Sequence, residues 1–128
     1  MINQKTRQHR TTSTSNAVET YLRGLDASAL LTTNENTKNV LKGNIYCYDN
    51  TNDLVSIFKI SAIVDNTNNI NTIKSLNGSI EGVIEELNEN NVSCRVVSSG
   101  NSNFTIRVSG NTNTLKWISD FEMLEFSK

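Results

Sequence analysis

Few residues of this chain have the types and spacing that catalysis requires. Nucleophilic catalysis needs a base held beside a nucleophile, and the single histidine, His9, stands in a polar segment near the N-terminus. Two carboxylate pairs, Asp49 with Asp53 and Glu85 with Glu86, are close enough in sequence for acid–base chemistry. However, the first pair falls in an asparagine-rich turn and the second on the acidic face of a predicted helix, where such groups are solvated. The sequence therefore predicts a protein that is not an enzyme.

The sequence also contains few residues with the spacing that a metal or cofactor site requires. Cys47 and Cys94 have no closely spaced partner of the kind that a zinc site needs. We expect two semi-buried thiols in a reducing compartment, joined by a disulfide only if their strands are neighbours. Residues 49–53 follow part of the calcium-loop spacing but lack its glycine and its late glutamate. We predict no cofactor and no small-molecule substrate.

Chain length and composition limit the class of protein. The 128 residues support one domain, and a charged fraction of 20% with a net charge of −1 is ordinary for a globular protein. No apolar run reaches the length of about 20 residues that spans a bilayer, so we expect no membrane partner. The chain has twenty asparagines and no proline. Because asparagine favours turns and caps, this composition indicates many turns between short elements, unless it reflects only an AT-rich coding sequence.

Residues 1–15 are predicted to form a flexible basic arm rich in Ser and Thr. The segment carries Lys5, Arg7 and Arg10, has no acidic residue and has almost no apolar side chain. Such a segment cannot bury enough surface to order itself. Its charge also contrasts with the rest of the chain, because the first 24 residues carry a net charge of about +3 and the remainder about −4. A basic arm on an acidic body suits docking onto another subunit.

Residues 16–39 are predicted to form an N-terminal helix followed by a polar loop. Asn16 and Glu19, three residues apart, resemble a capping box. The helix then has one apolar face, which we expect to contact a partner and which is made by Val18, Leu22 and Leu25.

Residues 40–128 are predicted to form an α+β domain. The predicted elements are strands at 40–48 and 54–64, a long helix at 70–87, a hairpin of 93–99 with 103–109, a short helix near 114–118 and a last strand at 121–126. From about residue 54, the order strand–helix–strand–strand–helix–strand resembles the ferredoxin-like βαββαβ fold, with both helices on one face of an antiparallel sheet. The resemblance is one of element order and identifies no function. The position of the 40–48 strand stays open, because the ferredoxin-like order already gives the 54–64 strand two neighbours.

Nucleic-acid binding is a weaker alternative. Lys59, Arg95 and Arg107 would share the free face of the predicted sheet, where RNA-binding modules of this architecture bind. Those modules stack bases on aromatic side chains of the same face, and the prediction places none there. We therefore expect nucleic acid to be an unlikely partner.

The remaining prediction is a non-enzymatic structural or assembly protein. Its Asn-, Thr- and Ser-rich composition is similar to that of small bacteriophage virion proteins, so we predict a capsid, neck or tail component, located in the virion or the host cytoplasm. Its partners would be other protein subunits or copies of itself, bound as an oligomer through the arm (Lys5, Arg7 and Arg10), the helix face and an open sheet edge. The alternative is a small regulatory or inhibitory module that binds one foreign protein.

Overall fold

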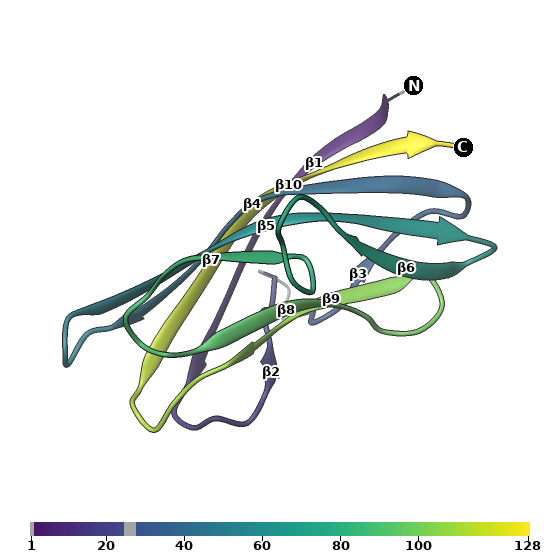
Figure 1. Cartoon of the computed structure of the whole chain (residues 1–128). Helices are drawn as coiled ribbons and strands as arrows, with labels where there is room; N and C mark the ends of the chain where they lie inside the picture. The colour runs from purple at the N-terminus through teal and green to yellow at the C-terminus, as the bar shows by residue number, and fades with distance from the viewer. Residues whose placement is uncertain (1, 25–27) are drawn as a thin grey trace.

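Two antiparallel sheets face each other in the computed structural model, which describes residues 2–24 and 28–128 (Figure 1). The large sheet has the order β1 (Ile2–Thr14), β10 (Leu115–Ser127), β4 (Thr37–Asp49), β5 (Leu54–Thr67), and β5 then pairs with both β6 (Ile70–Ser75) and β7 (Val83–Asn88). In the small sheet, β9 (Asn103–Ser109) is central and pairs with β8 (Ser93–Ser98), β2 (Thr20–Tyr21) and β3 (Leu31–Thr32). The described residues contain no helix, and hence none long and apolar enough to cross a membrane.

The predicted α+β, ferredoxin-like fold is therefore wrong, and the 70–87 segment shows why. It forms β6, a turn and β7 in place of a helix. Asn68 and Asn69 both have positive φ, 53° and 64°, as the two central residues of a type I′ hairpin turn require. Gly78 and Gly82 also have positive φ, 78° and 84°, which a right-handed helix excludes. The apolar residues spaced by three and four are mainly β-branched, and a strand accommodates them equally well.

The other two predicted helices are wrong for local reasons. The side-chain oxygen of Asn16 accepts a hydrogen bond from the Val18 N–H at 2.9 Å, which makes an Asx turn two residues long and starts no helix. Residues 114–118 contain the start of β10, and the Asn111 side chain accepts from the Asn113 N–H at 2.8 Å just before it. In both places a short amide side chain caps a turn that leads into a strand.

The segment predicted as a flexible arm is an ordered strand in the structure. β1 pairs with β10 along its length, from Ile2 opposite Phe126 to Thr14 opposite Leu115. The first and last strands of the chain thus lie side by side, as Figure 1 shows at the two termini. Residue 15 lies between β1 and β2, which belong to different sheets, and residue 39 lies within β4. A polar strand orders itself here because its partner supplies the backbone hydrogen bonds.

Several strand predictions are confirmed. The 40–48 and 54–64 strands lie within β4 and β5, which pair directly, and the predicted hairpin is β8 with β9. The 121–126 strand lies within β10, which occupies the other side of β4. This arrangement also settles the open position of the 40–48 strand, since it lies between β10 and β5.

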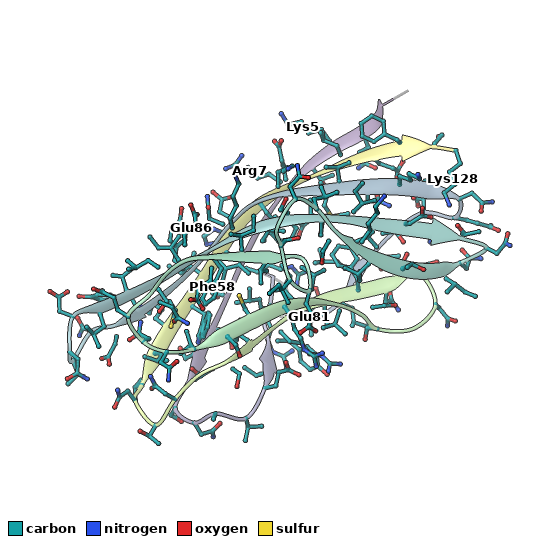
Figure 2. All side chains as sticks on the ribbon, viewed as in Figure 1. Lys5, Arg7, Phe58, Glu81, Glu86 and Lys128 are labelled. Atoms are coloured by element: carbon teal, nitrogen blue, oxygen red, sulfur yellow. The ribbon has the colours of Figure 1, made fainter. Side chains whose placement is uncertain are left out.

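The core fills the space between the sheets. Its largest fully buried side chains are Trp117, Phe121 and Phe104, and Phe58 lies in the same layer (Figure 2). The Trp117 Nε1–H donates to the Thr14 hydroxyl at 3.0 Å, so β1 supplies the polar partner that a buried indole needs.

The two cysteines are part of this core. Cys47 enters it from the large sheet and Cys94 from the small sheet, and both are buried free thiols. Burial raises the pKa of Cys47 to about 12 and also raises that of Cys94. Both thiols therefore stay protonated, which makes them poor nucleophiles.

Much of the asparagine content is used in turns. The non-glycine residues with positive φ in the described chain are mostly Asn or Asp: Asn36, Asp53, Asn68, Asn69, Glu81, Asn91 and Asn101. Asn and Asp tolerate this left-handed conformation better than other side chains do. The high asparagine content, which predicted many turns, thus corresponds to turn positions in the structure.

A backbone link closes one side of the sandwich. Thr11 of β1 and Arg23 exchange both backbone hydrogen bonds, with N···O distances of 2.9 and 3.0 Å. The preceding residue, Leu22, donates its N–H to the Ile106 carbonyl of β9 at 3.0 Å. The segment after β2 therefore pairs with both sheets at once.

A second link closes the opposite side. Ser61 of β5 donates its N–H to the Gly82 carbonyl, and Val96 of β8 donates to the Glu81 carbonyl, both at 2.9 Å. A Cβ added at Gly82 would lie 2.8 Å from the Val96 Cγ2 atom, so the link also needs a residue without a side chain.

Gly43 provides a first test of this packing. A Cβ there would lie 2.3 Å from the Asp120 carbonyl oxygen and 2.4 Å from the Phe121 Cα atom. We expect Gly43→Ala to lower the free energy of unfolding by about 1–3 kcal/mol through overpacking, measured by urea denaturation. Lys42→Ala at the exposed neighbouring position is the control and should change it by less than about 0.5 kcal/mol. Equal stability of the two variants would contradict the packing described here.

The turn between β4 and β5 provides a pH-dependent test. The Asp49 carboxylate accepts hydrogen bonds from the Thr51 and Asn52 N–H groups at 3.0 and 3.1 Å and from the Asn52 side chain at 2.9 Å. These bonds, the Asn52 side-chain bond first, hold the pKa of Asp49 below its usual value. In the segment that follows part of the calcium-loop spacing, the Asp49 carboxylate is therefore bonded to amides of its own turn.

Because the folded-state pKa of Asp49 is lowered, its stabilisation is present above the unfolded pKa of about 3.9 and is lost as the pH falls through the folded value. We expect the thermal midpoint of the wild type to fall between about pH 6 and pH 3 more than that of Asp49→Asn. Asp53→Asn is the matched control, because its carboxylate accepts a hydrogen bond from the Tyr48 hydroxyl at 2.9 Å and none from a turn amide of the described residues. A wild-type-like acid response of Asp49→Asn would refute this role.

Candidate docking site at the edge of the large sheet

β1 presents two different rows of side chains because successive residues of a strand face opposite sides. Lys5, Arg7 and His9 lie on the outer face of the large sheet and are exposed. The inward row is also polar and consists of Gln4, Thr6, Gln8 and Arg10. A sandwich normally places apolar residues on an inward row, so the inward face of β1 departs from the usual pattern.

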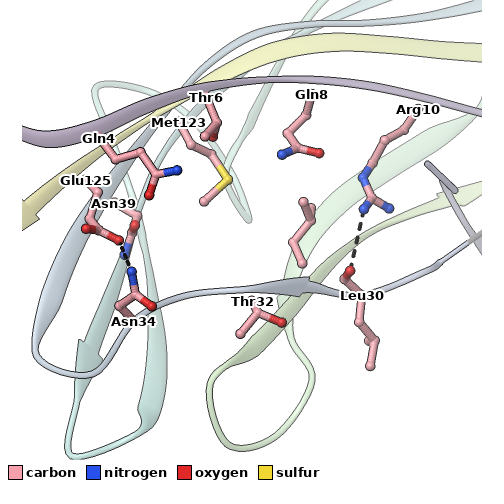
Figure 3. Close-up of a pocket in the computed structure, with 11 residues that line it drawn as sticks. Gln4, Thr6, Gln8, Arg10, Leu30, Thr32, Asn34, Asn39, Met123 and Glu125 are labelled. Carbon is pink, nitrogen blue, oxygen red and sulfur yellow. Dashed lines mark hydrogen bonds between the residues drawn. The ribbon is translucent and has the colours of Figure 1, made fainter. Parts of the chain in front are cut away.

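The inward row lines a groove between the two sheets. Figure 3 shows these side chains projecting from β1 toward the chain segment that carries Leu30, Thr32 and Asn34. The groove has a volume of about 360 Å³, and Asn39 and Met123 complete its lining from β4 and β10. Gln4, Thr6 and Gln8 have no side-chain hydrogen bond to any described residue, although amides and hydroxyls bond readily.

Arg10 closes one end of the groove. Its side chain is 4% exposed, and its guanidinium donates to the Leu22, Ser28 and Leu30 carbonyls at 3.2, 2.8 and 3.5 Å. This residue was predicted to contact a partner, but the structure gives it an internal role: it ties the segment between β2 and β3 to β1. At the other end, the Asn34 amide donates to a Glu125 carboxylate oxygen at 2.6 Å, which ties the loop between β3 and β4 to β10.

The exposed cations of β1 are paired with acids of β10. Arg7 makes a bidentate contact with Asp120, at 2.9 and 3.0 Å, and the Lys5 ammonium lies 3.4 Å from a Glu122 oxygen. The hydrogen bonds from Arg7 hold the pKa of Asp120 below its usual value. Figure 2 shows Lys5 and Arg7 projecting from the margin of the sheet. The cations thus lie on the outermost strand and the acids one strand further in.

The backbone of β1 is unpaired on its outer side over its first half. The exchange between Thr11 and Arg23 shows that the Thr11 backbone groups point away from β10. Because this direction alternates along a strand, the N–H and C=O groups of Lys5, Arg7 and His9 point the same way. No described residue forms a backbone hydrogen bond with these three, and we call their outward-facing groups the β1 edge.

The other predicted partner-binding residues are not brought together. Val18 is 71% exposed in a turn, whereas Leu22 is fully buried in the core, and Leu25 lies outside the described residues. The helix that would have aligned them does not form. Sequence reasoning missed Gln4, Thr6 and Gln8. Their only signal was that these neutral polar residues alternate with the basic residues Lys5, Arg7 and His9.

The three candidate nucleic-acid residues lie on different sheets. Lys59 is exposed on the large sheet, whereas Arg95 and Arg107 lie on the outer face of the small sheet. Glu19 accepts a bidentate contact from Arg95 at 2.8 and 2.9 Å and also lies 3.5 Å from Arg107.

A further acid and an aromatic ring complete this cluster on the small sheet. Arg95 also contacts Glu81 at 3.2 Å, and the Arg107 guanidinium lies 5.2 Å from the centre of the Tyr21 ring. These two cations are therefore engaged by acids and an aromatic ring of the same chain. Within residues 2–24 and 28–128 there is also no group of three or more His, Cys, Asp or Glu side chains that could hold a metal ion.

Arg10 and Arg7 give a matched pair for testing this site. Arg10→Leu should lower the free energy of unfolding by about 1–3 kcal/mol, because it leaves buried carbonyls without their donor. Arg7→Leu should leave it nearly unchanged, since that ion pair is exposed to water. Urea denaturation measures both, and an Arg10 variant as stable as the Arg7 variant would contradict the internal role of Arg10.

Neither models of known protein families nor characterised proteins match the sequence. Function is therefore inferred from the chain's own geometry, in which the β1 edge and the groove beside it are the most distinctive features of the described surface.

Proposed function

We propose that this protein is a non-enzymatic assembly subunit, of the kind that forms the capsid, neck or tail of a bacteriophage particle, and that it docks through β1. The observation that supports this function most directly is the β1 edge. Unpaired backbone groups on a long edge strand are a template for another chain, and a protein that must remain monomeric normally covers or shortens such a strand.

The other margins of the sandwich have short strands or are covered by a neighbouring segment. β6 and β7 span only six residues each, and the Val96 N–H of β8 is bonded to the Glu81 carbonyl. On the β3 side, Thr33 donates its N–H to the Ser102 carbonyl at 2.8 Å. Short strands and covering segments are the usual devices against unwanted pairing. Within the described residues, the β1 edge has neither of these two devices and carries the charged side chains of Lys5 and Arg7, which oppose pairing with a strand of like charge.

The core supports a role as a preformed subunit. Large side chains from both sheets are fully buried, so the sandwich needs no partner to complete its interior. Removing residues 1–15 would delete an entire strand and the hydroxyl that bonds Trp117, and truncation is therefore unsuitable as a test of docking.

The function is tested by following the intact chain in its natural source. An epitope-tagged chain should co-sediment with a high-mass particle in a gradient, at a fixed ratio to the other particle proteins. A regulatory module, the alternative that would use the same edge, should co-sediment with one partner protein at low mass. Recovery only as a free monomer, under conditions where particles form, would refute the proposal.

A further inference from the structure

The β1 edge and the groove together have the features of a site for strand addition. A strand paired to the outward-facing groups of Lys5, Arg7 and His9 would extend the large sheet by one strand. Its side chains would alternate between the outer face and the groove. The added strand would also cover the open side of the sandwich, beyond the point where the Thr11–Arg23 link already closes it.

The polar lining of the groove indicates what one face of the added strand must offer. Gln4, Thr6 and Gln8 make no side-chain hydrogen bond with a described residue, and they lie opposite Leu30 and Thr32 (Figure 3). Covering amides and hydroxyls without giving them partners is costly. The groove therefore favours small side chains that form hydrogen bonds, such as Ser, Thr or Asn, over large apolar ones.

The charges of β1 indicate what the other face must offer. An incoming strand meets Lys5, Arg7 and His9 before it meets Asp120 and Glu122, which lie one strand further in. Charges directly opposite each other on neighbouring strands stabilise the pair when they are unlike and destabilise it when they are alike. Carboxylates at alternate positions of the added strand would thus be favoured.

The same charges disfavour a second copy as the occupant. An antiparallel pairing of β1 with its own copy, centred on Arg7, would place Arg7 opposite Arg7 and Lys5 opposite His9. Shifting the register by two residues toward the N-terminus places Lys5 of each copy opposite Arg7 of the other. The edge thus discriminates against self-pairing while leaving a partner of opposite charge acceptable.

We infer that the β1 edge binds an extended segment of a different protein chain, whose residues alternate between acidic side chains and small polar ones. This inference rests on the proposed assembly function and names the chemistry of the partner segment. The occupied site would be a sheet continued across two subunits, held by backbone hydrogen bonds and selected by charge.

Two synthetic nine-residue peptides test the inference on the intact protein. One alternates glutamate with threonine, and its control alternates lysine with threonine. The glutamate peptide should slow amide hydrogen exchange at Lys5, Arg7 and His9 and bind at least about tenfold more tightly at low salt, and added salt should reduce this preference. Equal binding of the two peptides, or protection at another strand instead of β1, would overturn the inference.

Substitutions at position 9 separate backbone pairing from side-chain contacts. His9→Pro removes an N–H that points away from β10, and proline is tolerated at such edge positions. We expect it to bind the glutamate peptide about fivefold to tenfold more weakly than His9→Ala, which retains the N–H. Equal affinities of the two variants would overturn the proposed backbone pairing. Gln8→Pro should unfold more readily than either, because the Gln8 N–H faces β10.

Light scattering measures the mass of the free protein and so tests whether a second copy of the chain occupies the β1 edge. A dimer that His9→Pro abolishes would assign the edge to a second copy and overturn the inferred partner chemistry. The failures of the two proposals are distinguishable. A chain that enters particles but does not bind the glutamate peptide keeps its assembly role and loses the inferred partner, whereas one that binds the peptide but enters no particle loses the assembly role.

Discussion

The backbone groups at the margins of a sheet need hydrogen-bond partners, and this requirement shapes the whole sandwich. The segment after β2 meets it on one side, because Arg23 pairs with Thr11 while its neighbour Leu22 pairs with the small sheet. On the other side, the backbone link through Glu81 and Gly82 meets this requirement between β5 and β8. With both links in place, two sheets of unequal size enclose one core. The β1 edge is the stretch that these devices leave open.

Buried amides meet the same requirement where the loops cross the ends of the sheets. The Asn90 side chain donates to the Cys47 and Leu54 carbonyls at 3.3 and 3.1 Å. The Asn66 amide donates to the Thr33 and Ser102 hydroxyls at 2.9 and 3.1 Å. A short amide offers two donors and an acceptor, so each one secures a loop that an apolar residue would leave unbonded. This accounts for how a chain so rich in asparagine and without proline maintains a defined structure.

The sequence predicted the β8–β9 hairpin from the alternation of apolar and polar residues along each strand, and β5 from a continuous run that is apolar on both faces. It failed where neither of these two patterns was present. The 70–87 segment has apolar residues at helical spacing, but Ile70 is 65% exposed and Ile80 is 76% exposed, so they share no face. The Asn68–Asn69 turn lies just before the segment, the positive-φ Gly78 and Gly82 interrupt it, and the pairing of β6 and β7 with β5 decided its structure. β1 gave no apolar signal on either face, which is why an integral strand was interpreted as a flexible arm.

The candidate site was partly predictable for the same reason. Lys5 and Arg7 were identified from charge alone, and charge is also what distinguishes their edge in the structure. Arg10 was grouped with them, yet strand alternation sends it inward to bind carbonyls, a difference that depends on recognising β1 as a strand. Charged residues on an edge strand are a known defence against self-association. Because the defence acts through the sign of the charge, it opposes a copy and not an acidic segment, so under the proposed docking the same residues would both protect the free subunit and select its partner.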